Sequence, residues 1–199
     1  QAKNNIIMIS GPAPKVGKSF VCSNLAVIMA EKNKRVLVID ADLRRGHIHK
    51  YFDLDHQNGL TEYLNEQITL EQTIQNTNLP NLNVITCGKS STHPSELLNS
   101  VCFQELLQSV IPHYDHIIID TPPVLAVTDA TIVARYVGLN LVVARYAKTQ
   151  MKELELTLNR FKQAGCIVNG FILNDIQPSA AGSYTYDYIY SYKSRVQNS

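Results

Sequence analysis

The sequence predicts an α/β fold, a doubly wound and mostly parallel sheet with helices on both faces. Its apolar runs are continuous rather than alternating, as in RVLVID at 35–40 and HIIID at 116–120. Continuous runs are typical of strands that are covered on both faces. They alternate with helix-length amphipathic stretches, as expected for parallel strands joined by crossover helices. A chain of 199 residues with 45% apolar residues can also bury one sizeable core.

The expected elements follow the chain at regular intervals. We expect strands at residues 5–10, 35–40, 83–87, 116–120, 139–145 and 167–174. Long helices are expected at 18–32, 94–110 and 150–163, with shorter ones near 61–65 and 70–76. Pro94 suits a helix entrance and Gly165 a helix end. Together these elements form one domain, residues 1–178, followed by a tyrosine-rich tail at 179–199, where the composition changes to Ser, Gly, Ala and Tyr.

Composition excludes several classes of protein. Lys plus Arg number 18 against 17 for Asp plus Glu, so nothing favours a nucleic-acid partner. The four cysteines lie far apart without a CxxC pair and are interpreted as buried thiols in a reducing compartment. No apolar run approaches the roughly 18 residues of a membrane span, so we expect this segment to be soluble. Because the chain begins at Gln1, we expect it to be part of a longer protein.

The strongest motif is a phosphate-binding loop, GPAPKVGKS at 11–19, between a buried strand and a helix. This is the context of a Walker A loop, in which backbone N–H groups and the helix dipole hold phosphate oxygens. Gly17 allows close backbone approach, Lys18 would reach the terminal phosphates and Ser19 would ligate Mg²⁺. Five residues rather than four separate Gly11 from the Gly-Lys pair, so the loop is a variant.

Acidic residues follow two of the expected strands. Asp40 and Asp42 end the second strand and Asp120 ends the fourth. Oxygen ligands at the carboxyl ends of neighbouring strands suit Mg²⁺, and a carboxylate there would also accept the proton of an attacking hydroxyl. Each carboxylate could instead cap the turn that follows its strand. Arg44 and Arg45 would either stabilise charge on a transferring phosphoryl group or bind an acidic surface.

Together these motifs resemble the bacterial tyrosine kinases, and among them the cytoplasmic kinase domain of Wzc-type capsule and exopolysaccharide co-polymerases. GPAPKVGKSF matches their Walker A segment, VLVIDADLRRG their Walker A′ segment and IIIDTPP their Walker B segment. The match extends over nearly the whole chain. The resemblance implies a P-loop NTPase-like fold and an ATP-dependent, Mg²⁺-dependent protein-tyrosine autokinase.

The resemblance also implies a set of site residues. The implied catalytic residues are Lys18, Asp40, Asp42 and Asp120. The implied metal ligands are Ser19, Asp42 and Asp120. The implied nucleotide-binding residues are Gly11, Ala13, Val16, Gly17, Lys18, Ser19, Phe20 and Asn174. Asn174 would lie beside the adenine, although a polar residue there could equally cap the last strand.

The resemblance extends to partners and location. It implies self-association with phosphorylation in trans, a cognate protein-tyrosine phosphatase, and a transmembrane co-polymerase portion absent from this chain. It places the domain at the cytoplasmic face of the bacterial inner membrane. Two departures stand out. The upstream helix with its Glu/Arg oligomerisation motif is missing, and the tyrosine that some relatives carry beyond the Walker A′ arginines is His47 here, with Tyr51 four residues later.

Five tyrosines recur with a spacing of two near the C-terminus. They are Tyr184, Tyr186, Tyr188, Tyr190 and Tyr192. Ser, Thr and Asp between the rings favour an accessible tail, which we interpret as the phosphoacceptor, over an edge strand with an aromatic face. At ~3.3 Å per residue the stretch from 175 to 188 could span roughly 45 Å. The radius of gyration expected for such a domain is only about 16 Å, so this tail could reach a neighbour's site.

Two other functions remain alternatives on the sequence alone. A MinD/ParA-like positioning ATPase shares the phosphate loop, but such proteins usually carry a signature lysine where this chain has Ala13. A non-catalytic module could use the tyrosines to stack on a partner such as single-stranded nucleic acid. The near-neutral charge disfavours that second alternative.

Overall fold

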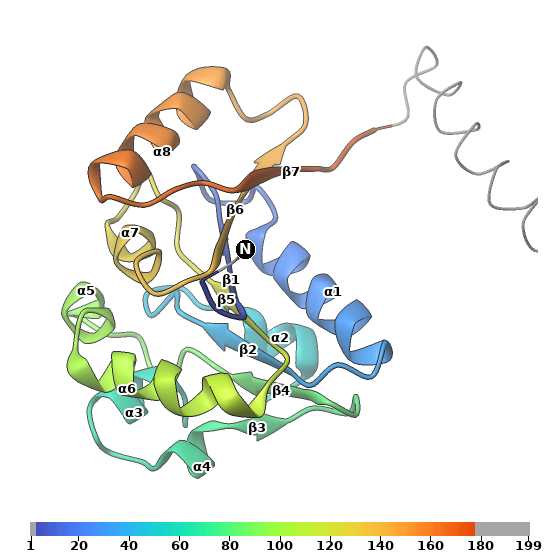
Figure 1. Cartoon of the computed structure of the whole chain (residues 1–199), viewed down its shortest axis with the longest axis vertical. Coiled ribbons are helices and arrows are strands. Elements are labelled where there is room, and N and C mark those ends of the chain that lie inside the picture. Colours follow the sequence, from blue (N-terminus) through green and yellow to red (C-terminus); the bar gives the residue numbers. More distant parts are fainter. Residues whose placement is uncertain (1–2, 178–199) are drawn as a thin grey trace, which may run out of the picture.

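A seven-stranded sheet forms the centre of the molecule (Figure 1). The computed structural model describes residues 3–177, so the five tail tyrosines and the predicted domain boundary lie outside the described residues. The strands are β1 Ile6–Ser10, β2 Val36–Asp40, β3 Gln75–Asn76, β4 Leu82–Ile85, β5 His116–Asp120, β6 Leu139–Arg145 and β7 Gly170–Asn174. They lie in the order β3-β4-β2-β5-β1-β6-β7.

All the strand pairs are parallel except that between β3 and β4 at one edge. Strand β5 lies between β1 and β2, with Asp120 in register with Ile9 on one side and with Asp40 on the other. The sheet order therefore brings the carboxyl ends of three strands together beside the loop that follows β1. This is the edge at which ligands bind in open α/β sheets.

Helices cover both faces of the sheet. They are α1 Lys18–Glu31, α2 Ile48–Phe52, α3 Leu60–Leu64, α4 Leu70–Thr73, α5 Pro94–Leu98, α6 Val101–Val110, α7 Asp129–Val133 and α8 Met151–Gln163, with a 3-10 turn at Ile111–His113. Side chains of α1 and α2 share one core with Ile7 and Ile9 of β1. Those of α3, α5, α6, α7 and α8 share the other with Ile6 and Met8. Neighbouring residues of β1 thus point to opposite cores, which confirms the doubly wound fold.

The expected elements differ from the observed ones in their short pieces. The predicted helix at 94–110 is two helices, because Ser100 interrupts it and its hydroxyl accepts a hydrogen bond from the N–H of Phe103 at 3.2 Å, which caps α6. The helix predicted at 70–76 ends at Thr73, and residues 75–76 pair with β4 as an edge strand. Helices α2 and α7, of five residues each, were not predicted.

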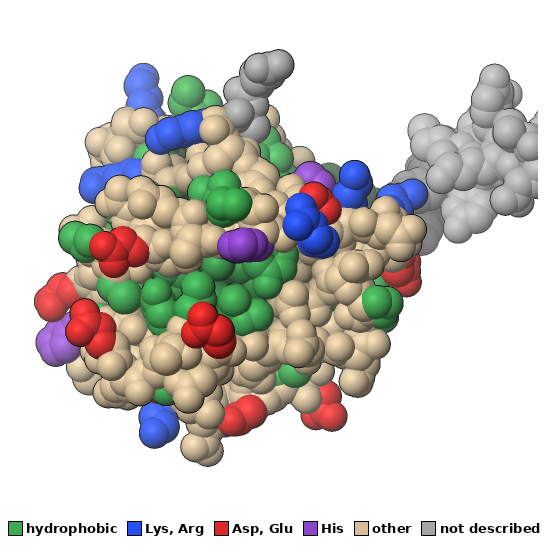
Figure 2. Space-filling model, turned by 60° about the horizontal axis from the view of Figure 1, so that its bottom comes forward, with side chains coloured by type: hydrophobic (Ala, Val, Ile, Leu, Met, Phe, Trp, Pro, Cys, Tyr) green, Lys and Arg blue, Asp and Glu red, His purple; other side chains and the backbone are tan. Residues whose placement is uncertain are grey.

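Hydrophobic side chains also gather on one face of the surface. Figure 2 shows these hydrophobic side chains at the centre of the surface near α3, α4 and α6. Acidic side chains lie around them. No helix within residues 3–177 combines the length and the apolar character that a membrane crossing requires.

We expect Phe161→Ala in α8 to lower the free energy of unfolding by about 3–5 kcal/mol, because a fully buried ring would leave a cavity. Lys162→Ala, an exposed change on the same helix, should alter it by no more than about 0.5 kcal/mol. Urea denaturation followed by circular dichroism measures both. Equal losses in the two variants would show that α8 does not anchor this core.

Candidate functional site

The loop between β1 and α1 has the backbone of a phosphate-binding loop. Gly17 caps α1 at φ 99°, a left-handed conformation that favours glycine. A Cβ atom on Gly11 would lie 2.9 Å from the carbonyl oxygen of Val143 in β6, so this position also requires glycine. The two glycines therefore wrap the chain tightly over the sheet and leave the free N–H groups of α1 at its open end.

Two neighbouring segments hold this loop in place. After β5, the N–H of Val124 donates to the carbonyl oxygen of Gly11 at 2.9 Å. From the end of β7, the amide nitrogen of Asn174 donates to the carbonyl oxygen of Val16 at 3.0 Å. A Cβ atom on Gly17 would lie only 2.0 Å from that same nitrogen. Asn174, predicted beside an adenine, thus lies against the backbone of the phosphate loop.

Ser19 and Asp120 meet directly at the base of the site. The Ser19 hydroxyl donates to Oδ2 of Asp120, a carboxylate only 1% exposed. Oδ1 of the same carboxylate is buried and has no hydrogen-bond partner among residues 3–177. Burial raises the pKa of Asp120 to about 7, although the Ser19 hydroxyl and the charge of Lys18 oppose the shift. Lys18 is 8% exposed, and burial lowers its pKa. The site thus holds incompletely compensated charge that a ligand could balance.

Asp40 and Asp42 have different surroundings although both follow β2. Asp40 is fully buried, and its two oxygens accept the N–H groups of Asp42 at 3.2 Å and Ile48 at 3.0 Å. Burial, and then the charge of Asp120, raise its pKa. Oδ1 of Asp42 accepts the N–H of Arg45 at 3.0 Å, whereas its Oδ2 makes no hydrogen bond within residues 3–177. Asp40 therefore supports the loop, and Asp42 keeps an oxygen available.

Arg44 is tied to the other side of the site by a residue that the sequence did not indicate. Its Nε donates to Oδ2 of Asp129 at 3.0 Å, and that aspartate is fully buried at the start of α7. The Ser95 hydroxyl donates to the other oxygen of Asp129 at 2.5 Å. These contacts fasten the loop after β2 to α5 and α7. Arg45 forms no ion pair in the described part of the chain.

These groups surround a hollow of about 530 Å³, which we call the catalytic hollow. The predicted residues that line it are Gly17, Lys18, Ser19, Phe20, Asp42, Arg44, Arg45 and Asp120. Predicted residues that support it from behind without lining it are Gly11, Ala13, Val16, Asp40 and Asn174. Lining residues that sequence reasoning did not assign to the site include His47, Tyr51, Pro122, Pro123, Ala126 and Val127. The two prolines lie two and three residues after Asp120, within the IIIDTPP segment, which is the one sequence signal that could have found them.

The donor set fits a magnesium ion that also takes phosphate oxygens. Within residues 3–177 no three His, Cys, Asp or Glu side chains enclose a metal site on their own. Mg²⁺, however, usually binds through one or two carboxylates together with waters and substrate phosphates. A buried Asp120 with an unpartnered oxygen beside the Ser19 hydroxyl matches that pattern, because a cation there would offset the cost of a buried charge.

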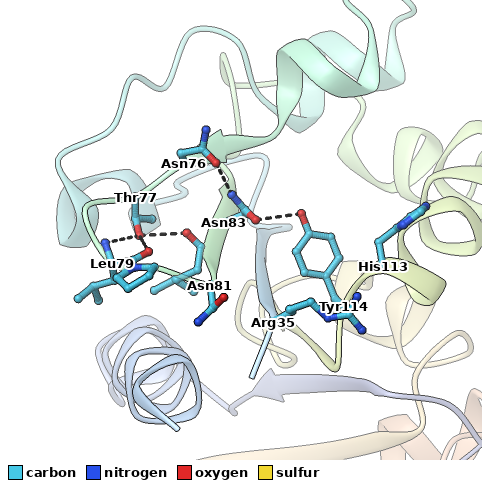
Figure 3. A pocket seen from close by; sticks show the side chains of 10 residues that line it. Arg35, Asn76, Thr77, Leu79, Asn81, Asn83, His113 and Tyr114 are labelled. Atoms are coloured by element: carbon cyan, nitrogen blue, oxygen red, sulfur yellow. Dashed lines mark hydrogen bonds between the residues drawn. The ribbon is translucent and has the colours of Figure 1, made fainter. Parts of the chain in front are cut away.

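A second hollow, of about 520 Å³, lies where several strands begin, at the other end of the sheet from the phosphate loop (Figure 3). Its polar groups largely bond one another. Asn83 donates to Asn76 at 2.7 Å and accepts from the Tyr114 hydroxyl at 3.2 Å. Thr77 donates to a backbone carbonyl oxygen at 3.0 Å. We assign no chemistry to it, since these groups already have partners in the structure.

Comparison with known proteins places this arrangement among kinases. An AAA-domain family model, AAA_31, matches residues 4–170. The chain is 66% identical over 181 residues to the tyrosine-protein kinase ptk of Acinetobacter johnsonii, covering 91% of this chain and 25% of that protein. It therefore spans about a quarter of the length of that relative. The kinase domain of the Escherichia coli tyrosine kinase ETK superposes with a TM-score of 0.86 at 45% identity, over 89% of this chain and 69% of that domain.

A positioning ATPase is more distant. The septum site-determining protein MinD of Pyrococcus horikoshii, solved with Mg-ADP, superposes with a TM-score of 0.70 at 25% identity, over 90% of this chain and 76% of that one. The shared architecture confirms the P-loop NTPase-like fold.

We expect Asp120→Asn to stabilise the protein free of metal and nucleotide, and to do so more at pH 8 than at pH 5. The folded pKa of about 7 lies above the ordinary 3.8, so the folded state holds this proton more tightly and loses stability as pH rises toward 7. The asparagine does not ionise and escapes this loss. One pKa unit corresponds to about 1.4 kcal/mol, so its advantage should grow by about 1–3 kcal/mol between the two pH values.

Urea denaturation in EDTA at both pH values measures this difference, and Asp115→Asn serves as the control. Asp115 pairs with the exposed Arg35, and this pairing lowers its pKa to about 2, so its variant should show no comparable gain at pH 8. If the gain in unfolding free energy from Asp120→Asn is the same at pH 5 and pH 8, the raised pKa of the buried Asp120 carboxylate is wrong.

Proposed function

We propose that this chain transfers the terminal phosphoryl group of ATP to tyrosine. It belongs to the bacterial tyrosine kinases of the AAA-domain family. The acceptors we assign are Tyr184, Tyr186, Tyr188, Tyr190 and Tyr192, which lie outside the described residues. The observation that carries the proposal is the convergence of Lys18, Ser19, Asp42 and Asp120 around one hollow.

The phosphate end of the donor would lie at the start of α1. There the N–H groups of the loop and the charge of Lys18 hold the phosphate oxygens and take up the negative charge that builds on the leaving ADP. Ser19 and Asp120 would hold Mg²⁺, with Asp42 completing its surroundings. When bound, this ion neutralises phosphate charge and orients the terminal phosphoryl group.

Asp42 is the residue placed to receive the proton of the acceptor. The tyrosine oxygen forms a bond to the terminal phosphorus, the bond from that phosphorus to the bridging oxygen of ADP breaks, and the phenolic proton passes to Asp42. A phenol has an ordinary pKa of about 10, so a nearby carboxylate assists its attack. Asp40 is a positioning residue, because both of its oxygens bond the backbone on either side of this loop.

The two arginines have separate roles in this proposal. Arg44 forms an ion pair with buried Asp129, and this pair holds one wall of the hollow in place. Arg45 has no such partner in the described residues and is the one free to approach the transferring group or an acidic peptide.

We also propose where the longer protein that contains this domain lies and in which process it acts. We assign the domain to a longer co-polymerase at the cytoplasmic face of the bacterial inner membrane, acting in capsule or exopolysaccharide export. Support comes from the relatives, of whose length this chain spans about a quarter. Transfer in trans between copies, and removal of the phosphates by a phosphatase, complete the proposal.

We expect the chain incubated with Mg²⁺ and γ-labelled ATP to acquire phosphotyrosine. Lys18→Met should lower the initial rate by about 10²-fold or more, since it removes a charge that stabilises the transition state. A chain that ends before Tyr184 should lose the label but still bind nucleotide. Lys152→Met on α8, an exposed change away from the site, is the control and should label normally.

This experiment also separates the proposal from the positioning ATPase. ATP hydrolysis without protein labelling would favour a MinD-like function, the alternative that Mg-ADP in the related MinD structure keeps open. Label that persists in Lys18→Met would overturn the kinase site.

A further inference from the structure

A third hollow, of about 530 Å³, lies beside the catalytic hollow, between the loop after β2, helix α2 and the loop after β4. We call it the basic pocket. The residues on which our inference depends are Arg45, His47, His49, Lys50, His56 and Lys89. Nothing in the proposed transfer reaction uses the far side of this pocket, where His49, Lys50, His56 and Lys89 lie.

The pocket concentrates positive charge. None of its lining residues is acidic. Arg45, Lys50 and Lys89 form no ion pair within residues 3–177, in contrast to Arg44, which Asp129 already compensates. The whole chain carries a net charge of only +1, so this gathering does not reflect a generally basic protein. Cations without carboxylate partners around a concave surface favour an anionic ligand.

The pocket is also lined by flat aromatic rings. His49 and His56 stack with ring centroids 4.9 Å apart. Nδ1 of His49 is buried and makes no hydrogen bond to the part of the chain that the structure describes. Burial, followed by the charges of His56, Lys50 and His47, lowers the pKa of His49. Stacked rings beside cations suit an aromatic ring that bears an anion, because one part of such a ligand packs on the rings and the other meets the charges.

The two hollows are contiguous. Arg44, Arg45, Gly46 and His47 line both of them, so a ligand in the basic pocket lies next to the place where an acceptor must enter. Alternate tyrosines of an extended peptide are about 7 Å apart. A peptide held by one modified tyrosine would therefore present the next unmodified one close to the catalytic hollow.

We propose that the basic pocket binds an aryl phosphate, the phosphotyrosyl side chain of a second copy's tail, and so retains a partly modified tail for its next transfer. This inference rests on the proposed function for the identity of the ligand. The cations hold the phosphate, and the phenyl ring packs against the outer side of the stacked histidine pair. Modification of the tail would then be successive, with each phosphate improving capture of the tail that carries it.

Binding can be measured without catalysis, on the phosphatase-treated 199-residue chain with no nucleotide. The probes are fluorescent peptides of residues 182–192, either unmodified or phosphorylated at Tyr188. We expect the phosphopeptide to bind at least tenfold more tightly. Lys50→Gln with Lys89→Gln should remove most of that difference, whereas Lys152→Gln with Lys162→Gln, an equal charge change on α8, should preserve it.

Competitors identify the ligand chemistry. Phenyl phosphate should displace the phosphopeptide at a concentration at least tenfold below that needed with inorganic phosphate or ADP. Equal binding of the two peptides, unchanged binding by the Lys50/Lys89 variant, or displacement by inorganic phosphate or ADP as readily as by phenyl phosphate would each overturn the inference. If the chain binds the phosphopeptide more tightly yet transfers no phosphate, the proposed function is wrong and the binding pocket is still supported.

Discussion

A buried carboxylate at the end of β5 is the constraint on which the site depends. Asp120 is almost fully excluded from water. One of its oxygens accepts a hydrogen bond from Ser19, and the other has no partner in the described part of the chain. A charge in such a place is costly unless something compensates it. Lys18 and the open end of α1 supply part of that compensation, and a metal-bound triphosphate would supply the rest. The burial that makes this charge costly therefore also favours a cationic ligand that offsets it.

The sheet order explains why these groups meet although they are far apart in the sequence. Strand β5 lies between β1 and β2, so Asp120 is in register with Asp40, the last residue of β2, and with Ile9, the last but one of β1. The phosphate loop follows one neighbour and the Asp40–Asp42 segment follows the other. Contacts behind the hollow, from Asn174 to the loop and from Arg44 to Asp129, then fix these segments against β7 and α7. The geometry of this candidate site depends on strand pairing as much as on side chains.

Much of this could be predicted from sequence, because its strongest signals are local. Continuous apolar runs gave the main strands, and the spacing of Gly17, Lys18 and Ser19 after a strand located the phosphate loop. Other features depend on distant partners. The division of labour between Asp40 and Asp42 follows from which backbone N–H groups each can reach, and Asp129 belongs to the site only because the chain folds α7 against Arg44. Neither leaves a periodic or spaced pattern that sequence reasoning could use.

The proposed site requires Ser19, Asp42 and Asp120 to bind the metal of a metal-bound nucleotide beside Lys18. Titration of the chain with fluorescent ADP, in Mg²⁺ and in EDTA, tests it most directly when repeated with Ser19→Ala and Asp120→Asn. Mg²⁺ should tighten nucleotide binding to the parent chain by about tenfold or more, and both variants should lose most of that gain. If the variants keep the full effect of Mg²⁺, the ion is held elsewhere and the proposed site is wrong.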